Sequence, residues 1–325
     1  MKKLVYIAIA LFAVSLGLAL PVDPEVFVQH ELPRPPFEKV ITMDLSSYAE
    51  TRLEQGFDLL FIHHSCGGQL MADAGIDQGE HCIYASHPNG GGLRRLLEEN
   101  GYAVHEASYS SALGERTDLF DWLPKFRDDM DVIRTCSLQD THLPDSVVNR
   151  IVLFKSCYPN NNFVAEGTAP GNPAGPDLTV WNAKSSFRAL LNELAKHPDT
   201  LFVCLTAPPL APKQKPVPLW KAVSRKLMGK GIDINERAAY ARSFNNWLKS
   251  TEGWLHGYGG RNVAVFDYYH LLTGEGRSDL SAYPTGNGYD SHPSHEGNRK
   301  AAEALVPFLN RAVRRAELRP EVTLH

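Results

Sequence analysis

Residues 58–68, DLLFIHHSCGG, indicate the kind of fold and contain candidate functional residues. Its first half is short and apolar, which is typical of a strand buried on both faces. Its polar end carries a serine, a cysteine and two glycines. Comparable apolar runs occur at 103–109, 150–156, 200–206 and 262–272. The sequence therefore predicts five strands that are mostly buried.

Helical patterns separate these apolar runs. They lie after Gly92, from Trp181, over residues 235–250 and from His295 onward. Strands alternating with helices predict a mostly parallel sheet covered by helices on both faces. We therefore expect a three-layer α/β/α sandwich of the flavodoxin-like kind, with a five-stranded parallel sheet in the order 2-1-3-4-5.

The composition is that of an ordinary globular protein. The chain has 325 residues, of which 43% are hydrophobic and 22% charged, and these fractions exclude a collagen-like or intrinsically disordered chain. Lys and Arg number 33 against 37 Asp and Glu, giving a formal net charge of −4. Because proteins that bind nucleic acid usually carry a basic excess, we expect no nucleic-acid partner.

The amino-terminal residues predict export. Two lysines, an apolar run and small residues near Ala19 are typical of a signal peptide that is cleaved near Ala19. An uncleaved N-terminal membrane anchor is the alternative. We therefore expect a secreted or periplasmic protein. The expected parts are a signal peptide at 1–19, an extended lead-in at 20–50, a single domain at 51–315 and a C-terminal tail at 316–325.

Five cysteines are too few to build the fold from disulfides. Cys66 and Cys157 would follow neighbouring strands, at a spacing that a disulfide can bridge. A bridge between them and two buried free thiols are both open at this point. No spacing of cysteines and histidines matches a known structural zinc site.

Polar residues that suit acyl transfer follow the predicted strands. In such sheets the ligand crevice lies beyond the carboxyl ends of the strands, where Ser65 ends the first apolar run. A serine nucleophile needs an imidazole base, and the imidazole needs a carboxylate, which His292 and Asp290 supply just before the last helix. Gly114 and Asn160 follow neighbouring strands and suit the donors that stabilise an oxyanion.

This set of residues resembles the SGNH (GDSL-like) hydrolases. The stretch His292-Pro-Ser-x-x-Gly is similar to the last conserved block of that family, and the five-strand plan extends the likeness over residues 58–310. The resemblance implies an esterase that needs no cofactor and no metal. It also implies Ser65 as nucleophile, His292 as base and Asp290 as the acid that orients it, with an oxyanion hole completed by Gly114 and by Asn160 or Asn161.

The chain departs from the family pattern at three places. His63-His64 stands where Gly-Asp usually precedes the nucleophile, and the acid is one residue closer to the base than usual. The Gly-x-Asn-Asp block is replaced by residues 155–161, KSCYPNN. We therefore expect a divergent member of the family.

These residues are compatible with three functions. The first is an exported serine esterase that hydrolyses or transfers an O-acyl group of a small molecule or polysaccharide, such as an acetylated carbohydrate. The second is a non-catalytic carbohydrate-binding module on the same fold. The third is a metal-dependent phosphoesterase that uses His63, His64, His292 and His295. The lysine-rich segment 213–230 adds a possible contact with a membrane surface or an acidic polymer.

Overall fold

A computed structural model describes residues 40–214 and 232–319 of the chain. The predicted signal peptide, most of the lead-in, nearly all of the lysine-rich segment and the end of the tail lie outside the described residues. No helix within the described parts is both long and apolar enough to cross a membrane.

The centre of the fold is a five-stranded sheet in which every pairing is parallel. Its strands lie in the order β5-β1-β6-β7-β8, which is 2-1-3-4-5 when these five strands are counted along the chain. The bounds are Phe57–Ile62 for β1, Tyr102–Ala107 for β5, Ile151–Lys155 for β6, Leu201–Leu205 for β7 and Val263–Phe266 for β8. The expected kind of fold is confirmed.

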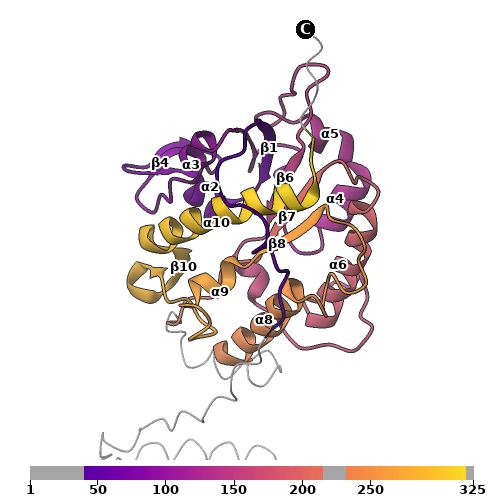
Figure 1. Ribbon diagram of the computed structural model, residues 1–325. Helices are drawn as coiled ribbons and strands as arrows, with labels where there is room; N and C mark the ends of the chain where they lie inside the picture. The colour runs from indigo at the N-terminus through magenta and orange to yellow at the C-terminus, as the bar shows by residue number, and fades with distance from the viewer. Residues whose placement is uncertain (1–39, 215–231, 320–325) are drawn as a thin grey trace, which may run out of the picture. The chain divides into compact units, whose positions relative to one another are not determined.

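Helices cover both faces of this sheet (Figure 1). Leu60 and Ile62 of β1 pack on one face with residues of α4, α5, α6 and α8, whereas Leu59 and Phe61 pack on the other with residues of α2, α3, α9 and α10. The period of two along a strand explains this division. The bounds are Ser65–Met71 for α2, Leu93–Glu99 for α3, Trp122–Asp128 for α4, Met130–Thr135 for α5, Val180–Leu194 for α6, Ile234–Lys249 for α8, Tyr268–Leu272 for α9 and His295–Ala316 for α10.

The predicted fifth strand at 262–272 is wrong in its second half. β8 ends at Phe266, and Tyr268–Leu272 form α9. Asp267 lies between the two elements, and its side chain accepts a hydrogen bond of 3.0 Å from the His270 N–H. This carboxylate satisfies a free backbone donor at the start of the helix, so one capping residue ends the strand pattern.

Two short β-structures lie outside the main sheet. A three-stranded ribbon between α2 and α3 has the order β2-β4-β3, and a two-stranded ribbon precedes α10. A single-turn helix η2 follows β6. The bounds are Asp73–Ala74 for β2, Gln78–Glu80 for β3, Ile83–His87 for β4, Pro284–Thr285 for β9, Asp290–Pro293 for β10 and Tyr158–Asn161 for η2.

Candidate active site

Ser65 is the first residue of α2, just beyond the carboxyl end of β1, and its side chain is partly buried. The two glycines of this helix permit close packing around it. A Cβ atom on Gly67 would lie 2.3 Å from the Cβ of His63, and one on Gly68 would lie 1.8 Å from the carbonyl oxygen of Cys82. Helix α2 therefore packs tightly against its own strand end and against the β3–β4 turn, which positions Ser65.

The structure brings Ser65, His292 and Asp290 together. The Oγ atom of Ser65 lies 2.9 Å from Nε2 of His292, although 227 residues separate them in the sequence. Nδ1 of the same imidazole lies 2.7 Å from Oδ1 of Asp290. The three side chains therefore form a continuous hydroxyl–imidazole–carboxylate chain of hydrogen bonds at the carboxyl edge of the sheet, within the distances that proton transfer requires.

Asp290 is held as an acceptor by two donors of one residue. Its Oδ1 also accepts the backbone N–H of His292 at 3.1 Å, which forms an Asx turn. Although partial burial opposes ionisation, these two N–H groups hold the pKa of the Asp290 carboxyl below its ordinary value. An ionised carboxylate at this position selects the imidazole tautomer that carries its proton on Nδ1.

Contacts made by the start of α10 and by Tyr158 help to position His292. The strand β10 leads directly into α10, where Nδ1 of His295 lies 2.6 Å from the carbonyl oxygen of Gly90. Asn298 donates to the carbonyl of Asn89 at 2.8 Å. The ring of Tyr158 packs edge-on against His292, with centroids 5.1 Å apart. The imidazole is thus positioned from two sides.

Gly114 does not provide the expected oxyanion donor. Its N–H already donates to Oγ of Ser111 at 2.9 Å, and its carbonyl accepts a hydrogen bond from Nε2 of His64 at 2.7 Å. A Cβ atom at this position would lie 2.2 Å from the carbonyl oxygen of Ser108. The glycine is therefore required for a close approach of backbone segments, which corrects the role inferred from the sequence.

Asn160 and Asn161 tie loops together and make no hydrogen bond with Ser65 among the described residues. Asn160 donates to Oδ1 of Asp118 at 2.8 Å. The Nδ2 group of Asn161 donates to two successive carbonyls beyond β7, that of Ala207 at 2.9 Å and that of the following proline at 2.8 Å. Both asparagines are buried. The carbonyls after β7 use the side-chain amide of Asn161, which corrects the expectation that this residue is an oxyanion donor. Asn160 donates into the loop after β5, and its role as an oxyanion donor stays a prediction.

Cys157 and a buried lysine that was not predicted from the sequence lie beside Ser65. The Sγ atom of Cys157 lies 3.7 Å from Oγ of Ser65, and Nζ of Lys155 lies 3.8 Å from that sulfur. Lys155 is fully buried at the end of β6. A lysine that closes an otherwise apolar run, two residues before a cysteine, was the available signal.

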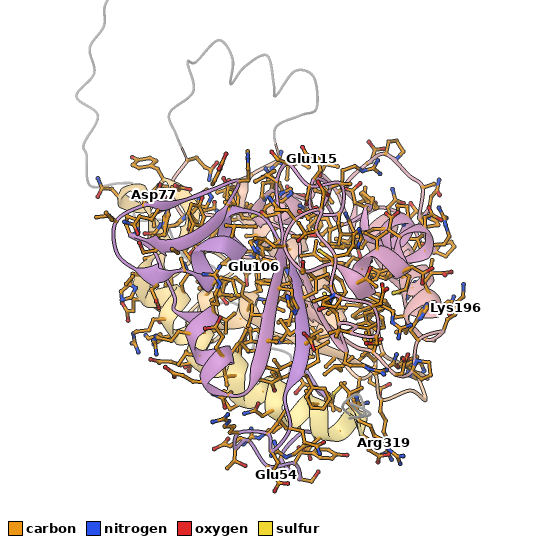
Figure 2. The ribbon with its side chains drawn as sticks, turned by 90° about the horizontal axis from the view of Figure 1, so that it is seen from above. Glu54, Asp77, Glu106, Glu115, Lys196 and Arg319 are labelled. Carbon is orange, nitrogen blue, oxygen red and sulfur yellow. The ribbon has the colours of Figure 1, made fainter. Side chains whose placement is uncertain are left out.

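The adjacent histidines have the two different environments that strand geometry predicts. His63 is fully buried, and its Nε2 lies 2.9 Å from Oε1 of Glu106, which also pairs with Arg94. Figure 2 shows Glu106 inside the fold, in contrast to the peripheral Lys196. Burial favours the neutral acid, but the hydrogen bond and charge of His63, together with Arg94, hold the pKa of Glu106 below its ordinary value. This cluster supports the end of β1.

His64 instead is partly buried and directly precedes Ser65. Its ring stacks on Tyr109 with centroids 3.7 Å apart. Burial lowers the pKa of His64, although its hydrogen bond to the Gly114 carbonyl opposes this shift.

The expected metal alternative finds no ligand cluster in the part of the chain that the structure describes. No group of three or more His, Cys, Asp and Glu side chains there has the arrangement to hold a metal ion. Each of the four histidines considered makes a hydrogen bond through a ring nitrogen to another group of the protein.

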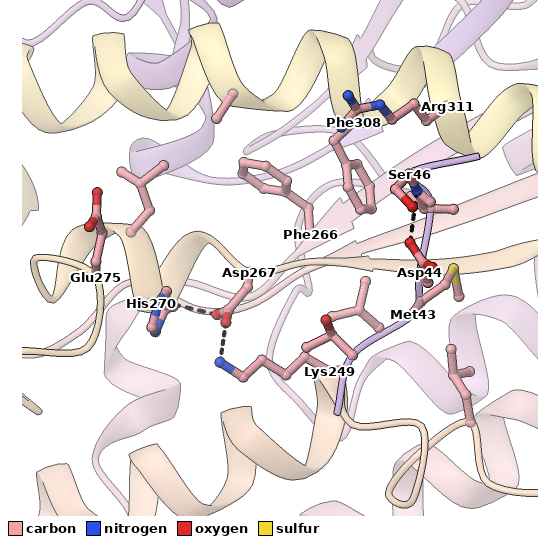
Figure 3. A pocket seen from close by; sticks show the side chains of 16 residues that line it. Met43, Asp44, Ser46, Lys249, Phe266, Asp267, His270, Glu275, Phe308 and Arg311 are labelled. Atoms are coloured by element: carbon pink, nitrogen blue, oxygen red, sulfur yellow. Dashed lines mark hydrogen bonds and ion pairs between the residues drawn. The ribbon is translucent and has the colours of Figure 1, made fainter. Parts of the chain in front are cut away.

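A cavity of about 550 Å³ lies elsewhere, beside the edge strand β8 (Figure 3). Asp267 and Lys249, two charged residues of its lining, make contacts that stabilise the fold. Asp267 pairs with Lys249 at 2.6 Å and caps α9 through the N–H of His270, as the dashed lines in Figure 3 show. Phe266 and Phe308 form part of its apolar lining. None of Ser65, His292 and Asp290 lines this cavity, so it is separate from the candidate active site.

Comparisons with known proteins identify no family for this chain. No family model matches it, and no curated protein does. A solved structure described as a possible lipase from Chitinophaga pinensis shares 14% identity with a TM-score of 0.36, and the alignment covers 81% of this chain and 100% of that one. A second solved structure has the same identity and TM-score and covers 78% and 96% of the two chains. At this similarity neither match assigns an activity, and the candidate active site is defined by its own geometry.

Proposed function

We propose that the chain is a serine ester hydrolase of the SGNH type. The observation that carries the proposal is the pair of contacts made by His292, 2.9 Å to the Ser65 hydroxyl and 2.7 Å to the Asp290 carboxylate. Residues this far apart in sequence meet in the arrangement that activates a serine for attack on an acyl carbonyl.

The proposed reaction uses the same three side chains in its acylation and deacylation halves. Ser65 attacks the carbonyl carbon while His292 takes the hydroxyl proton, and Asp290 stabilises the resulting imidazolium. His292 then gives its proton to the departing alcohol, which leaves an acyl-enzyme. Water, or another alcohol in a transfer reaction, attacks this intermediate by the same route and regenerates the free serine. The backbone N–H of Ser65, the first residue of α2, is a proposed oxyanion donor.

The proposed substrate is an O-acyl ester, with an acetylated carbohydrate as the favoured class. Two aromatic side chains near the reacting groups support this choice. Tyr109, stacked on His64, is 36% exposed, and Tyr289, next to the catalytic carboxylate, is 43% exposed. Exposed aromatic rings offer flat apolar surfaces with a polar edge, which suit the C–H faces and hydroxyls of a sugar ring. Export, inferred from the amino-terminal residues, would give the enzyme access to extracellular polysaccharide.

One observation favours a different function. The donors expected from Gly114 and Asn161 are used by other groups, so a chain that has lost catalysis and only binds carbohydrate is the second candidate.

Hydrolysis of p-nitrophenyl acetate by wild type and Ser65→Ala, with and without a chelator, tests these alternatives. We expect the variant to lose at least about a thousandfold in kcat/KM and the chelator to have no effect. Ser46→Ala, an exposed serine remote from the triad, is the matched control and keeps full activity. A fluorophosphonate should label Ser65, as shown by peptide mapping. Hydrolysis that survives in Ser65→Ala would contradict the proposed nucleophile, and an inactive, unlabelled wild type would favour the binding module.

A further inference from the structure

Two thiols lie close to Ser65, on the chain segments that follow the neighbouring strands β1 and β6. Cys66 is the second residue of α2, and Cys157 follows the end of β6 by two positions. β1 and β6 pair in parallel from Leu59 and Ile151 onward, so both segments begin at the same edge of the sheet. All five cysteines of the chain are free thiols in this structure. Cys66 is fully buried, and Cys157 is 8% exposed beside the partly exposed Ser65.

A buried cation accompanies these thiols. Nζ of Lys155 donates to the carbonyl of Ser156 at 3.3 Å and to Sγ of Cys157 at 3.8 Å. The lysine is fully buried and forms no ion pair with a carboxylate in the described parts of the chain. An isolated ammonium in such surroundings costs several kcal/mol unless an anion lies beside it. A thiolate at Cys157 supplies that anion.

The donors around Cys157 favour the same charge state. Its sulfur lies 3.7 Å from Oγ of Ser65, the residue just before Cys66, and 3.8 Å from Nζ of Lys155. The hydrogen bond from the Cys66 thiol, together with the charge of Lys155, outweighs burial and lowers the pKa of Cys157 well below its ordinary value. Burial raises the pKa of Cys66 well above the ordinary value. The pair therefore consists of one nucleophilic thiolate and one thiol that keeps its proton.

We propose that Cys157 and Cys66 form a thiol–disulfide exchange site that reacts with low-molecular-weight disulfides, with Cys157 as the attacking thiolate and Cys66 as the resolving thiol. The cluster of Lys155, Cys66 and Cys157 carries this proposal, which does not depend on the proposed esterase activity.

The exchange proceeds in two balanced steps, shown here for glutathione disulfide. The Cys157 thiolate attacks one sulfur, the glutathione S–S bond breaks, and one glutathione leaves as a thiolate. Cys66 then transfers its proton to that thiolate, and its sulfur attacks the Cys157 sulfur and expels the second glutathione as a thiolate. The two cysteines are oxidised to a disulfide, and glutathione disulfide is reduced to two molecules of glutathione. The new bridge ties the loop that carries Ser65 to the loop after β6.

The test is incubation of the folded, full-length protein with glutathione disulfide at pH 7, followed by non-reducing peptide mapping. We expect a Cys66–Cys157 bridge to form and to disappear on addition of dithiothreitol. Cys66→Ser should instead accumulate a glutathione adduct on Cys157, because the resolving thiol is missing. Lys155→Met, which removes the buried charge and keeps a similar length, should slow the reaction at pH 7 about tenfold or more. Circular dichroism establishes that each variant is folded.

Cys204→Ser is the matched control. Cys204 is buried within β7, and burial raises the pKa of its thiol, so the variant should form the bridge at the wild-type rate. The result for the wild-type protein alone also tests the proposed exchange site. If Cys66 and Cys157 stay free in the folded wild type, or if another cysteine reacts first, the proposal is overturned. An undiminished rate in folded Lys155→Met would likewise remove its basis.

Discussion

The orientation of the His292 ring determines whether this imidazole can accept a proton from Ser65. Among residues 40–214 and 232–319, the imidazole ring makes two polar contacts, one to the Ser65 hydroxyl and one to the Asp290 carboxylate. Because the carboxylate contacts the backbone N–H of the same histidine as well, it sets both the position and the tautomer of the ring.

Asp290→Asn tests this role directly. An amide in place of the carboxylate no longer stabilises the imidazolium and permits the wrong tautomer, so we expect kcat/KM for p-nitrophenyl acetate to fall by roughly a hundredfold to ten-thousandfold. The side chain is 47% exposed, so thermal unfolding should change little. Glu296→Gln, at the exposed start of α10, is the control and should leave the rate unchanged. A fully active Asp290→Asn variant would show that the carboxylate has no catalytic role.

Asn161→Ala separates loop tying from oxyanion binding. The substitution removes two hydrogen bonds to the carbonyls after β7 and leaves these groups without partners, so the free energy of unfolding should fall by about 1–3 kcal/mol. We expect the folded variant to keep kcat within a few-fold of wild type. A loss of a hundredfold or more in kcat, measured well below the unfolding temperature, would restore the oxyanion assignment.

At the scale of single elements, α4 carries a buried charge that opposes folding. Lys125 is 6% exposed and donates to the carbonyl of Leu113. Burial lowers its pKa from 10.5 to about 8, although Asp129 and Asp121 oppose the shift. Below pH 8 the lysine is protonated in the folded and unfolded states. Between pH 8 and 10.5 the folded state loses this proton first, so stability rises with pH.

Lys125→Met should remove that rise. The wild type is expected to gain up to about 3 kcal/mol in the free energy of unfolding between pH 8 and pH 10.5, and the variant is not. Urea unfolding at several pH values measures the difference. Lys196→Met, at a side chain that is 61% exposed, should keep the wild-type slope. Parallel pH profiles for wild type and Lys125→Met would contradict the prediction.

The elements that sequence reasoning predicted are those with a clear hydrophobic pattern. Runs that are apolar throughout, such as Ile151–Lys155, are recognisable because both faces of the sheet are covered. The ribbon of β2, β3 and β4 was not predicted, because its residues are partly or fully exposed and show no apolar alternation. The helix α9 was hidden inside an apolar run, and only the contact of Asp267 with a backbone N–H distinguishes it.

The residues of the candidate site also divide into those that the sequence predicts and those that it does not. That Ser65, His292 and Asp290 come together could be predicted, because each proposed chemical role requires a particular side chain next to a strand end or helix start. The donors expected from Gly114 and Asn161 make other hydrogen bonds, because glycine and asparagine are common in loops for conformational reasons that a sequence does not separate from catalysis. The burial of Lys155 could not be predicted, since it depends on packing from both sides of the sheet.

At the scale of the whole molecule, Glu106 joins three separate elements. It lies in β5, contacts His63 at the end of β1 and pairs with Arg94 of α3. It is 3% exposed, so its charge has little access to solvent. Breaking such a cluster leaves its partners buried without compensation.

Glu106→Gln should therefore cost about 3 kcal/mol in the free energy of unfolding at pH 7. The folded pKa of Glu106 lies below its ordinary value of 4.5, so the ionised form stabilises the fold above that pH, and this contribution is lost as the pH falls through the folded pKa. The difference between wild type and variant should shrink in acid. Denaturant titrations at pH 7 and below pH 4.5 measure it. A difference that does not change with pH would contradict the assignment of this cluster.

The order of the triad along the chain has a consequence for biosynthesis. The nucleophile is made early, whereas the base and its carboxylate come just before α10, the helix that covers one face of the sheet. A nascent polypeptide therefore contains a serine that stays inert while most of the protein is being translated. Under the proposed mechanism, hydrolysis begins only after the segment through residue 316 has emerged and docked, so the newly made enzyme stays latent until the fold is complete.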